Sequence, residues 1–459
     1  MRLTRRQALA GAAASALSAA GIYELVDRLS GEAPKRAAGT PHPPEQHLLD
    51  SIAVIEDNGV EVVVPPLHHR LVTAKVRAGD LRSARRQLND ALAELDRRYE
   101  PTPAGLGVTV GWGLPYFERH VPAAWESHAP RDRRARKLAL IPAIRFPSDP
   151  DDTVLEDNDV AVLLRSDTSA HIADAGGVLF GDLSIFDVTS IREGFVGGGF
   201  GGRRSLPKKL AVAAGIAGAD LIPDSAQLFL GFTSTQKDGL GPRRIVNYET
   251  LGYVDLGPRA YFREGTSMHV SHLFEDLESW YLNFDFGERV DTAFHPGLEV
   301  RSNVQTVRQA PRDIEHTAQV KRDFRRRGRI GHAASIQTSS RLQRDHVGED
   351  GTVYKSGTAI PQRADFNTLD NPFAWSARPD RDAMQDGPAA GLHFVVFNPT
   401  SDDFHRNRLA MDGQLPDGTR LPLEPRDRNQ GFNAVLRTTH RQNFLVPPRK
   451  HRSFPLAEL

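Results

Sequence analysis

The stretch Arg70-Leu71-Val72-Thr73-Ala74-Lys75-Val76 has the composition of a β-strand, and a helical pattern over residues 80–99 follows it almost at once. Five apolar residues of that pattern recur at intervals of three or four, which places them on one face of a helix. They are Leu81, Ala84, Leu88, Leu92 and Leu95. Asp80, just before them, is a plausible N-cap residue. This part of the chain therefore predicts a strand followed by an amphipathic helix.

The segment that follows continues the alternation of strands and helices. Residues 108–112 alternate as in a half-buried strand, and residues 159–164 form a second apolar run that predicts a strand. We expect a short helix over residues 169–178 and a further strand over residues 184–188. The resulting order, β-α-β-loop-β-α-β, is that of a ferredoxin-like unit.

A second and less regular copy of this unit begins near residue 253. Its expected elements are a strand at 267–273, a helix at 274–282, a strand at 392–397 and a helix at 401–411. Two such units predict an α+β protein with a duplicated ferredoxin-like fold, similar to a dimeric α+β barrel, with two antiparallel sheets and surrounding helices. We expect a site between the two sheets.

Four parts follow from this organisation. They are a signal segment at 1–30, a Pro-rich linker and lead-in at 31–64, an N-terminal ferredoxin-like domain at 65–240, and a C-terminal ferredoxin-like domain with long insertions at 241–459.

The first part contains Thr4-Arg5-Arg6-Gln7-Ala8-Leu9, a pair of arginines before a mildly apolar stretch at residues 8–22. That stretch is too short and too weakly apolar to span a bilayer. The combination favours a twin-arginine export signal over an ordinary Sec signal or a frayed N-terminal helix. Small residues run from Gly11 to Gly21 without one decisive A-x-A, which leaves two alternatives open: a mature chain that begins near Ala20, or a segment that stays as an anchor. We expect a protein that folds before export and works outside the cell, in the periplasm or in the cell envelope.

The composition excludes several classes of function. The chain has 58 Lys and Arg residues against 58 Asp and Glu residues, so its net charge does not indicate nucleic-acid binding. It has no cysteine, which excludes disulfides, thiolate catalysis and iron–sulfur ligation. No apolar run after residue 30 is long enough to cross a bilayer, so membrane contact is expected only through an uncleaved signal segment.

Two motifs invite a functional interpretation that the surrounding sequence does not support. Residues 197–202 match the glycine pattern of a dinucleotide-binding loop, but the second strand with its terminal acid is missing, so a plain Gly-rich loop is favoured. His269 and His272, with Glu275 and Asp276 nearby, have the residue types of a metal site. If residues 267–273 form a strand, however, the two histidines point to opposite faces and cannot bind one ion.

Gly331-His332, directly after the basic run at 325–329, is a better candidate. A neutral imidazole can hold haem iron, and basic residues can pair with haem propionates. From spacing alone, a surface histidine is the alternative.

Several segments carry a resemblance to one known family. They are residues 159–164, 228–232 and 265–273, then Gly331-His332, Gln362-Arg363 followed by Asp365-Phe366, and finally residues 391–397. In this order the chain, from about residue 67 to residue 411, resembles a divergent branch of the dye-decolorizing peroxidase (DyP-type) superfamily. The resemblance implies the duplicated ferredoxin-like fold that was reached above from the strand and helix pattern.

The resemblance also implies a function and a site. Members are exported enzymes with haem b that use peroxide to oxidise a small organic donor. By this resemblance His332 is the proximal ligand of the haem iron, and Arg363 is the distal arginine that contacts both haem and peroxide. Asp238 is the distal catalytic aspartate. The family places that aspartate in a compact Gly-Phe-x-Asp-Gly, whereas here residues 233–237 separate Gly231-Phe232 from Asp238-Gly239.

The proximal side also departs from the family pattern. The carboxylate partner of the histidine should follow the strand that ends at Phe397, but Asn398-Pro399-Thr400 stand there, and Asp402 or Asp403 comes late. A weaker hydrogen bond would make the imidazole less basic and reduce its support for high-valent iron. We expect weak or lost activity from such departures.

Two other functions stay open at this point. One is a non-enzymatic protein that binds haem or another hydrophobic ligand on the same scaffold, since a fold does not guarantee its chemistry. The other is a haem-free protein whose scaffold serves assembly, for which a homo-oligomer is expected.

Overall fold

The computed structural model describes residues 22–30, 45–57, 60–197, 204–232, 256–257, 259–298, 317–347, 353–371, 387–425, 427 and 430–459. Within these ranges, none of the helices combines the length and the apolar character that crossing a membrane requires.

The N-terminal half forms one antiparallel sheet with two helices. Its elements are β3 (His68–Val76), α3 (Leu81–Arg98), β4 (Gly107–Gly113), β8 (Val160–Ser166), α6 (Ser169–Gly176) and β9 (Phe186–Phe195). The strands lie in the order β4-β8-β3-β9. In this order the two central strands are the first and third of the unit, as the ferredoxin-like interpretation requires.

The C-terminal half repeats this arrangement with longer connections. Its elements are β10 (Thr266–Glu275), α8 (Leu277–Leu282), α9 (Phe286–Ala293), α10 (Thr317–Arg327), α11 (His332–Ser340), β14 (Phe366–Thr368), β15 (Gly391–Asn398), α13 (Ser401–Met411) and β16 (Leu436–Val446). The strand order β14-β15-β10-β16 matches that of the first half. The α+β fold with its duplicated ferredoxin-like unit is therefore confirmed.

Shorter elements connect and flank the two halves. They are α2 (Glu24–Ser30), β1 (Ala53–Asp57), β2 (Val60–Val64), α4 (Leu114–His120), α5 (Pro122–His128), β5 (Arg131–Asp132), β6 (Lys137–Leu138), β7 (Val154–Leu155), η1 (Gly177–Gly181), α7 (Leu206–Ala213), η3 (Ala219–Leu221), β11 (His346–Val347), β12 (Val353–Tyr354), β13 (Gln362–Arg363), η5 (Gly431–Ala434) and η6 (Arg449–His451).

The two predicted sheets are joined at both edges. Asn367 of β14 pairs with Phe195 of β9, and Phe444 of β16 pairs with Gly113 of β4. Because β10 pairs with both β15 and β16, the eight main strands form a closed ring. Buried apolar side chains of both halves pack inside this ring, and the cavity described below lies outside it. They include Leu71, Leu163, Met268, Phe366, Val395 and Phe444. The expectation of a site between the sheets is wrong for this reason.

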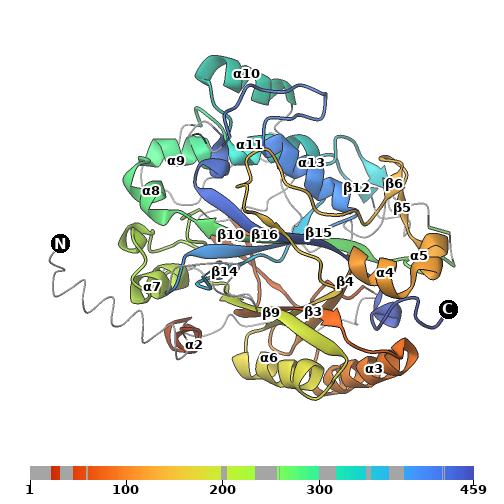
Figure 1. Cartoon of the computed structure of the whole chain (residues 1–459). Helices are drawn as coiled ribbons and strands as arrows, with labels where there is room; N and C mark the ends of the chain where they lie inside the picture. Colours follow the sequence, from red (N-terminus) through yellow and green to blue (C-terminus); the bar gives the residue numbers. More distant parts are fainter. Residues whose placement is uncertain are drawn as a thin grey trace.

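Helices cover the two outer faces of the ring. Figure 1 shows α3 and α6 on one side, and α9, α11 and α13 on the other, beyond β10, β15 and β16. The helix α3 begins as predicted, because the side chain of Asp80 accepts hydrogen bonds from the backbone N–H groups of Arg82 and Ser83, at 3.0 and 3.1 Å. Its apolar face, with Leu88 and Leu92 fully buried, packs on the first sheet.

The short helix α2 packs against the body of the protein. Val26 is fully buried, and the Tyr23 hydroxyl donates a hydrogen bond of 2.6 Å to Asp370. The Asp27 carboxylate lies 2.6 Å from Nε2 of His68 on β3. Residues 22–30 are therefore part of the folded body, although they belong to the segment predicted as a signal; residues 1–21 lie outside the described residues.

Candidate functional site

A cavity of about 290 Å³ lies between the outer face of the second sheet and the helices that cover it. Strands β10, β15 and β16 form one wall, and α9, α11, α13 and η5 form the other. The wall on β10 follows from strand periodicity: Ser271, Leu273 and Glu275 line the cavity, whereas Val270 points into the ring. Small-molecule sites span roughly 300 to 1,000 Å³, so the cavity is at the lower end of that range.

His332 reaches the cavity from the helix wall. It is the first residue of α11, and its ring packs against Phe432 of η5 with 4.5 Å between the ring centroids. Gly331 precedes it in a position that only glycine fits. A Cβ atom there would lie 2.2 Å from the carbonyl oxygen of Phe294. The close approach of these two backbones fixes where the histidine enters the cavity.

The imidazole of His332 is held in its neutral form. Burial first, and then the charges of Arg363 and Arg408, lower the pKa of His332 from 6.5 to about 3. Nδ1 is buried, and among the described residues neither ring nitrogen has a hydrogen-bond partner. A neutral imidazole with free nitrogens is a competent metal ligand.

The two aspartates that come late in the sequence do not reach this histidine. Asp403 caps α13 together with Thr400 and lies 2.9 Å from the guanidinium of Arg134. Asp402 pairs with Lys137. The expected carboxylate–histidine hydrogen bond is therefore not formed by either residue, as the shifted spacing suggested.

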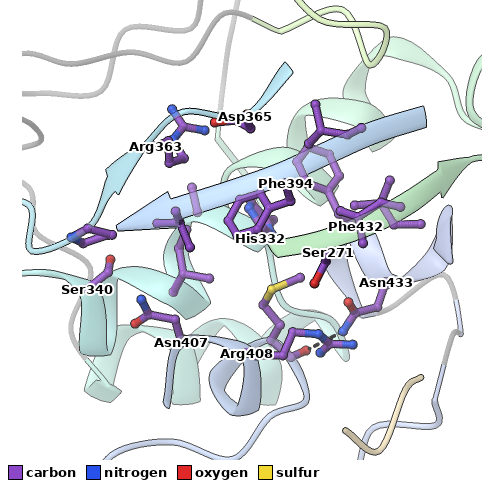
Figure 2. Close-up of a pocket in the computed structure, with 18 of the residues that line it drawn as sticks. Ser271, His332, Ser340, Arg363, Asp365, Phe394, Asn407, Arg408, Phe432 and Asn433 are labelled. Atoms are coloured by element: carbon purple, nitrogen blue, oxygen red, sulfur yellow. Dashed lines mark hydrogen bonds between the residues drawn. The ribbon is translucent and has the colours of Figure 1, made fainter. Parts of the chain in front are cut away.

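Arg363 lines the same cavity from the opposite wall. It lies on β13, where it pairs with Val396 of β15, and it is an exposed residue that lines the cavity. His332 and Arg363 line this one cavity, from the helix side and from the sheet side (Figure 2), and their predicted roles stay a prediction.

A second arginine of the cavity was not predicted. Arg341, the residue after α11, has a pKa lowered to about 9 by burial and by the charge of Arg363. Among the described residues neither Arg341 nor Arg363 has a carboxylate partner. In contrast, Arg408 and Arg441, which also line the cavity, both pair with Asp149, at 3.3 and 2.7 Å. The first pair is therefore available to an anion, whereas the second pair is structural.

Two carboxyl groups also line the cavity, and neither was predicted as a site residue. Glu275 is the last residue of β10 and is only 3% exposed. Burial, and then the charge of Asp365, raise the pKa of Glu275 from 4.5 to about 8. Asp365 lies two residues after Arg363 and also lines the cavity. The period-two pattern of Ser271, Leu273 and Glu275 was the one signal in the sequence that could have placed Glu275 here.

The histidines of β10 point to opposite faces, as predicted. His269 faces the helices, where Nδ1 lies 2.7 Å from Oδ1 of Asn443 and Nε2 lies 2.5 Å from the hydroxyl of Ser271. His272 faces the ring interior, with its ring centroid 4.2 Å from that of His393. Burial lowers the pKa of His269 well below its usual value, so this imidazole is a poor proton acceptor.

The segment that carries Gly231-Phe232 reaches the cavity, since Leu228, Leu230 and Phe232 line it. Phe232 packs edge-on against Phe294, with 5.3 Å between the ring centroids. The predicted catalytic residue Asp238 lies outside the described residues.

Comparisons with solved structures agree with this fold. A DyP-type peroxidase from Cellulomonas bogoriensis superposes with a TM-score of 0.51 at 20% identity, covering 89% of this chain and 96% of that one. A protein from Shewanella oneidensis named as a candidate DyP-type peroxidase gives a TM-score of 0.50 at 13% identity, covering 86% and 96%. The chain thus has the DyP-type fold. None of the curated proteins matches it by sequence.

The sequence comparison with family models extends over most of the chain. Residues 66–448, which include every strand of the closed ring and the whole described cavity, match the model described as "Family of unknown function (DUF7405)". The chain has the fold of the DyP-type peroxidases and belongs to the DUF7405 family.

Proposed function

We propose that this protein is an exported, haem-dependent peroxidase that uses peroxide to oxidise a small organic donor. One observation carries the proposal. In a chain with the DyP-type fold, a neutral histidine and an arginine line one cavity from opposite walls, and within the described residues the histidine ring has no hydrogen-bond partner and the arginine no carboxylate partner.

The residues of the cavity fit haem b. Haem needs an iron ligand, an apolar slot for the porphyrin and cations for its propionates. His332 offers the ligand, and its buried Nδ1 lacks a partner among the described residues. Apolar side chains form much of both walls, among them Phe232, Phe294, Leu392, Phe394 and Phe404. Arg341 and Arg363 offer two positive charges that no described carboxylate neutralises.

The residues that line the cavity would have different roles in the reaction. His332 would hold the iron through the ring nitrogen that faces the cavity. Arg363 would orient peroxide and stabilise the negative charge that develops on the departing oxygen. The apolar walls would exclude bulk water and strengthen both interactions. Bound haem would supply the redox chemistry, the two-electron reduction of peroxide followed by oxidation of the donor.

The proximal side sets a limit on this activity. A hydrogen bond from Nδ1 to a carboxylate raises the basicity of a ligating imidazole. Since His332 lacks such a partner among the described residues, it would donate less charge to the iron. We expect slower turnover than in an enzyme with that hydrogen bond, and the expected catalytic role of Asp238 stays a prediction.

Export is proposed on the sequence of the first residues, with support from α2. A signal that ended at Ala20 would release a chain starting at Gly21, and the residues after it pack onto the folded body through Tyr23 and Val26. Removal at that point would leave this packing intact. The identity of the organic donor is not assigned. Association of two copies of the chain stays an expectation.

The proposed peroxidase activity is tested by measuring dye oxidation by the haem-loaded protein. Protein reconstituted with haem should oxidise a phenolic dye only when hydrogen peroxide is added, and His332→Ala should abolish this. A haem spectrum without peroxide-dependent turnover would instead support the non-enzymatic haem-binding function.

A further inference from the structure

The segment that carries Arg363 continues along the sheet to Asp365 without a break. β13 and β14 both pair with β15, and they do so in one uninterrupted register. Between them, the backbone N–H of Ala364 donates a hydrogen bond of 2.8 Å to the carbonyl oxygen of Val395. Asp365 therefore belongs to the same extended stretch as Arg363, and its place in the register is opposite Phe394 of β15.

Strand alternation separates the residues of this stretch by face. Ala364 and Phe366 pack inside the ring, whereas Arg363 and Asp365 line the cavity outside it. A rise of about 3.3 Å per residue places the Cα atoms of Arg363 and Asp365 about 7 Å apart on that face. Long side chains at such a separation are within reach of one another. The wall opposite His332 thus carries a cation and an acid at neighbouring positions.

Neither of these two charged side chains is neutralised in the described part of the fold. Within the described residues, the side chains of Arg363 and Asp365 form no hydrogen bond and no ion pair. Asp132, by contrast, lies 3.1 Å from the guanidinium of Arg134. The guanidinium offers only donors and an ionised carboxylate only acceptors. Together they suit a small ligand that both accepts and donates hydrogen bonds, as hydrogen peroxide does.

The other candidate groups of the cavity are less well placed. Glu275 lies on β10, four residues beyond the row of the sheet that holds Ser271 and Asp365, or about 13 Å farther along. Ser271 lies in that row, but its hydroxyl is 2.5 Å from Nε2 of His269, which is a poor proton acceptor. Of the two carboxyl groups that line the cavity in the described ranges, Asp365 is therefore the one beside Arg363.

We propose that Asp365 is the catalytic residue that moves the proton of peroxide, an inference that rests on the proposed function. Its carboxylate takes the proton from one peroxide oxygen and returns it to the other, so Asp365 ends the step unchanged. The O–O bond breaks, and the oxygen that receives the proton leaves as water with the electron pair of that bond. The second oxygen stays with the haem, which supplies the two electrons. Arg363 cannot replace the acid, because a guanidinium has no acceptor and stays protonated.

This assignment gives Asp365 the task that the family resemblance assigns to Asp238. In this chain residues 233–237 separate Asp238 from Gly231-Phe232. Asp365, in contrast, is held next to Arg363 by the register of the sheet itself. The variants D365N and D238N therefore distinguish the two assignments.

The position of Asp365 can be tested without haem. Burial, and then the charge of Asp365, raise the pKa of Glu275 from 4.5 to about 8. Infrared difference spectra of the haem-free protein should show the carboxyl C=O band of Glu275 titrating near that pH, and E275Q identifies the band. D365N should move the midpoint of this titration toward lower pH, because it removes the negative charge. D90N, which removes a charge from an exposed position of α3, should leave the midpoint unchanged.

The catalytic role is tested with the haem-loaded protein. Asn keeps the size of Asp365 but cannot take up the proton. Haem affinity, from a Soret titration, should be equal in wild type, D365N and D90N. Stopped-flow reaction with peroxide should slow by roughly 10²- to 10⁴-fold in D365N and keep its wild-type rate in D90N. D365E restores a carboxylate and should recover part of the rate.

Three results would overturn the assignment. They are a D365N protein that reacts with peroxide at the wild-type rate, a D365N protein that is slow only because it binds haem weakly, and a haem-free D365N protein in which Glu275 titrates as in the wild type. A wild-type rate in D365N together with a slow D238N would return the role to Asp238. Wild-type protein that binds no haem overturns the proposed function itself, and the assignment with it.

Discussion

The guanidinium of Arg363 lies close enough to His332 that its charge, second only to burial, lowers the pKa of the imidazole to about 3. The two residues lie on separate elements, one on β13 and the other at the start of α11, and both line one cavity. This pairing combines a neutral nitrogen ligand with a positive charge across a small volume.

Arg363→Gln should impair the reaction with peroxide far more than haem binding. Loss of one preorganised donor to a developing negative charge costs about 100-fold or more in rate. Stopped-flow reaction of the haem-loaded variant with hydrogen peroxide measures this, and a Soret titration checks the affinity. Arg363→Lys should recover part of the rate, because it restores the charge without the planar fork. A wild-type rate in Arg363→Gln would exclude this role.

Arg341→Gln should weaken haem binding. Its half-buried side chain has no carboxylate partner in the described part of the chain, so a haem propionate is the anion we expect it to bind. A charge-assisted hydrogen bond contributes about 1.5 to 3 kcal/mol, which corresponds to a loss of affinity on the order of ten- to a hundredfold. The matched control is Arg344→Gln, an exposed position nearby, which should leave haem affinity unchanged. Equal affinity in both variants would contradict the prediction.

Gly331→Ala should displace His332. The added Cβ would meet the backbone of Phe294 at 2.2 Å, and backbone cannot move aside as a flexible side chain could. We expect a lower urea midpoint and a weaker, shifted Soret band. Gly177→Ala, where a Cβ meets no atom within 4 Å, is the control and should leave the haem spectrum unchanged. A normal spectrum in Gly331→Ala would show that the position of the histidine does not depend on this contact.

Acid should destabilise the folded protein through its buried histidines. Burial lowers the pKa of His69, His269, His272 and His393 in the folded state below the value of about 6.5 in an unfolded chain. The unfolded state therefore binds more protons below that pH, and the free energy of unfolding falls as the pH drops from about 6.5. Urea midpoints at pH 7.5 and pH 5.5 measure the effect.

The variant His69→Phe measures how much one of these histidines contributes to the pH dependence of stability. The ring of His69 stacks on Phe366 at 4.9 Å, and neither of its nitrogens has a partner among the described residues, so phenylalanine fits the same contacts. The midpoint should change less between the two pH values than in the wild type. The exposed His128→Gln should keep the wild-type difference. An unchanged difference in His69→Phe would mean that this histidine does not titrate as burial requires.

The fold could be predicted from the sequence where the apolar residues of a strand or helix repeat with the period of that element. The strand with Leu71, the helix capped by Asp80 and the strand with Val270 each show their period over a few residues. The last strand, β16, does not show such a pattern. Its residues from His440 to Asn443 are polar yet buried, because partners far along the chain, such as Asp149 for Arg441, compensate them.

The site could be predicted only in part. His332 and Arg363 were named through the family resemblance, and the structure brings both to one cavity. Arg341 and Glu275 were missed because their significance depends on which segments fold over them. The spacing of residues along the chain cannot show that Glu275, at the end of its strand, faces a cavity. It also cannot show that Arg341 has no carboxylate partner among the described residues. The role of Asp238 stays a prediction.

The most direct test of the account is a haem titration followed in the Soret region. Wild-type protein should bind one haem per chain and develop a sharp Soret band, and His332→Ala should lose that band and bind haem at least a hundredfold more weakly. His128→Ala, at an exposed position, should bind as the wild type does. A wild-type protein that stays colourless with haem present, or a His332→Ala variant that gives the wild-type spectrum, would contradict the account.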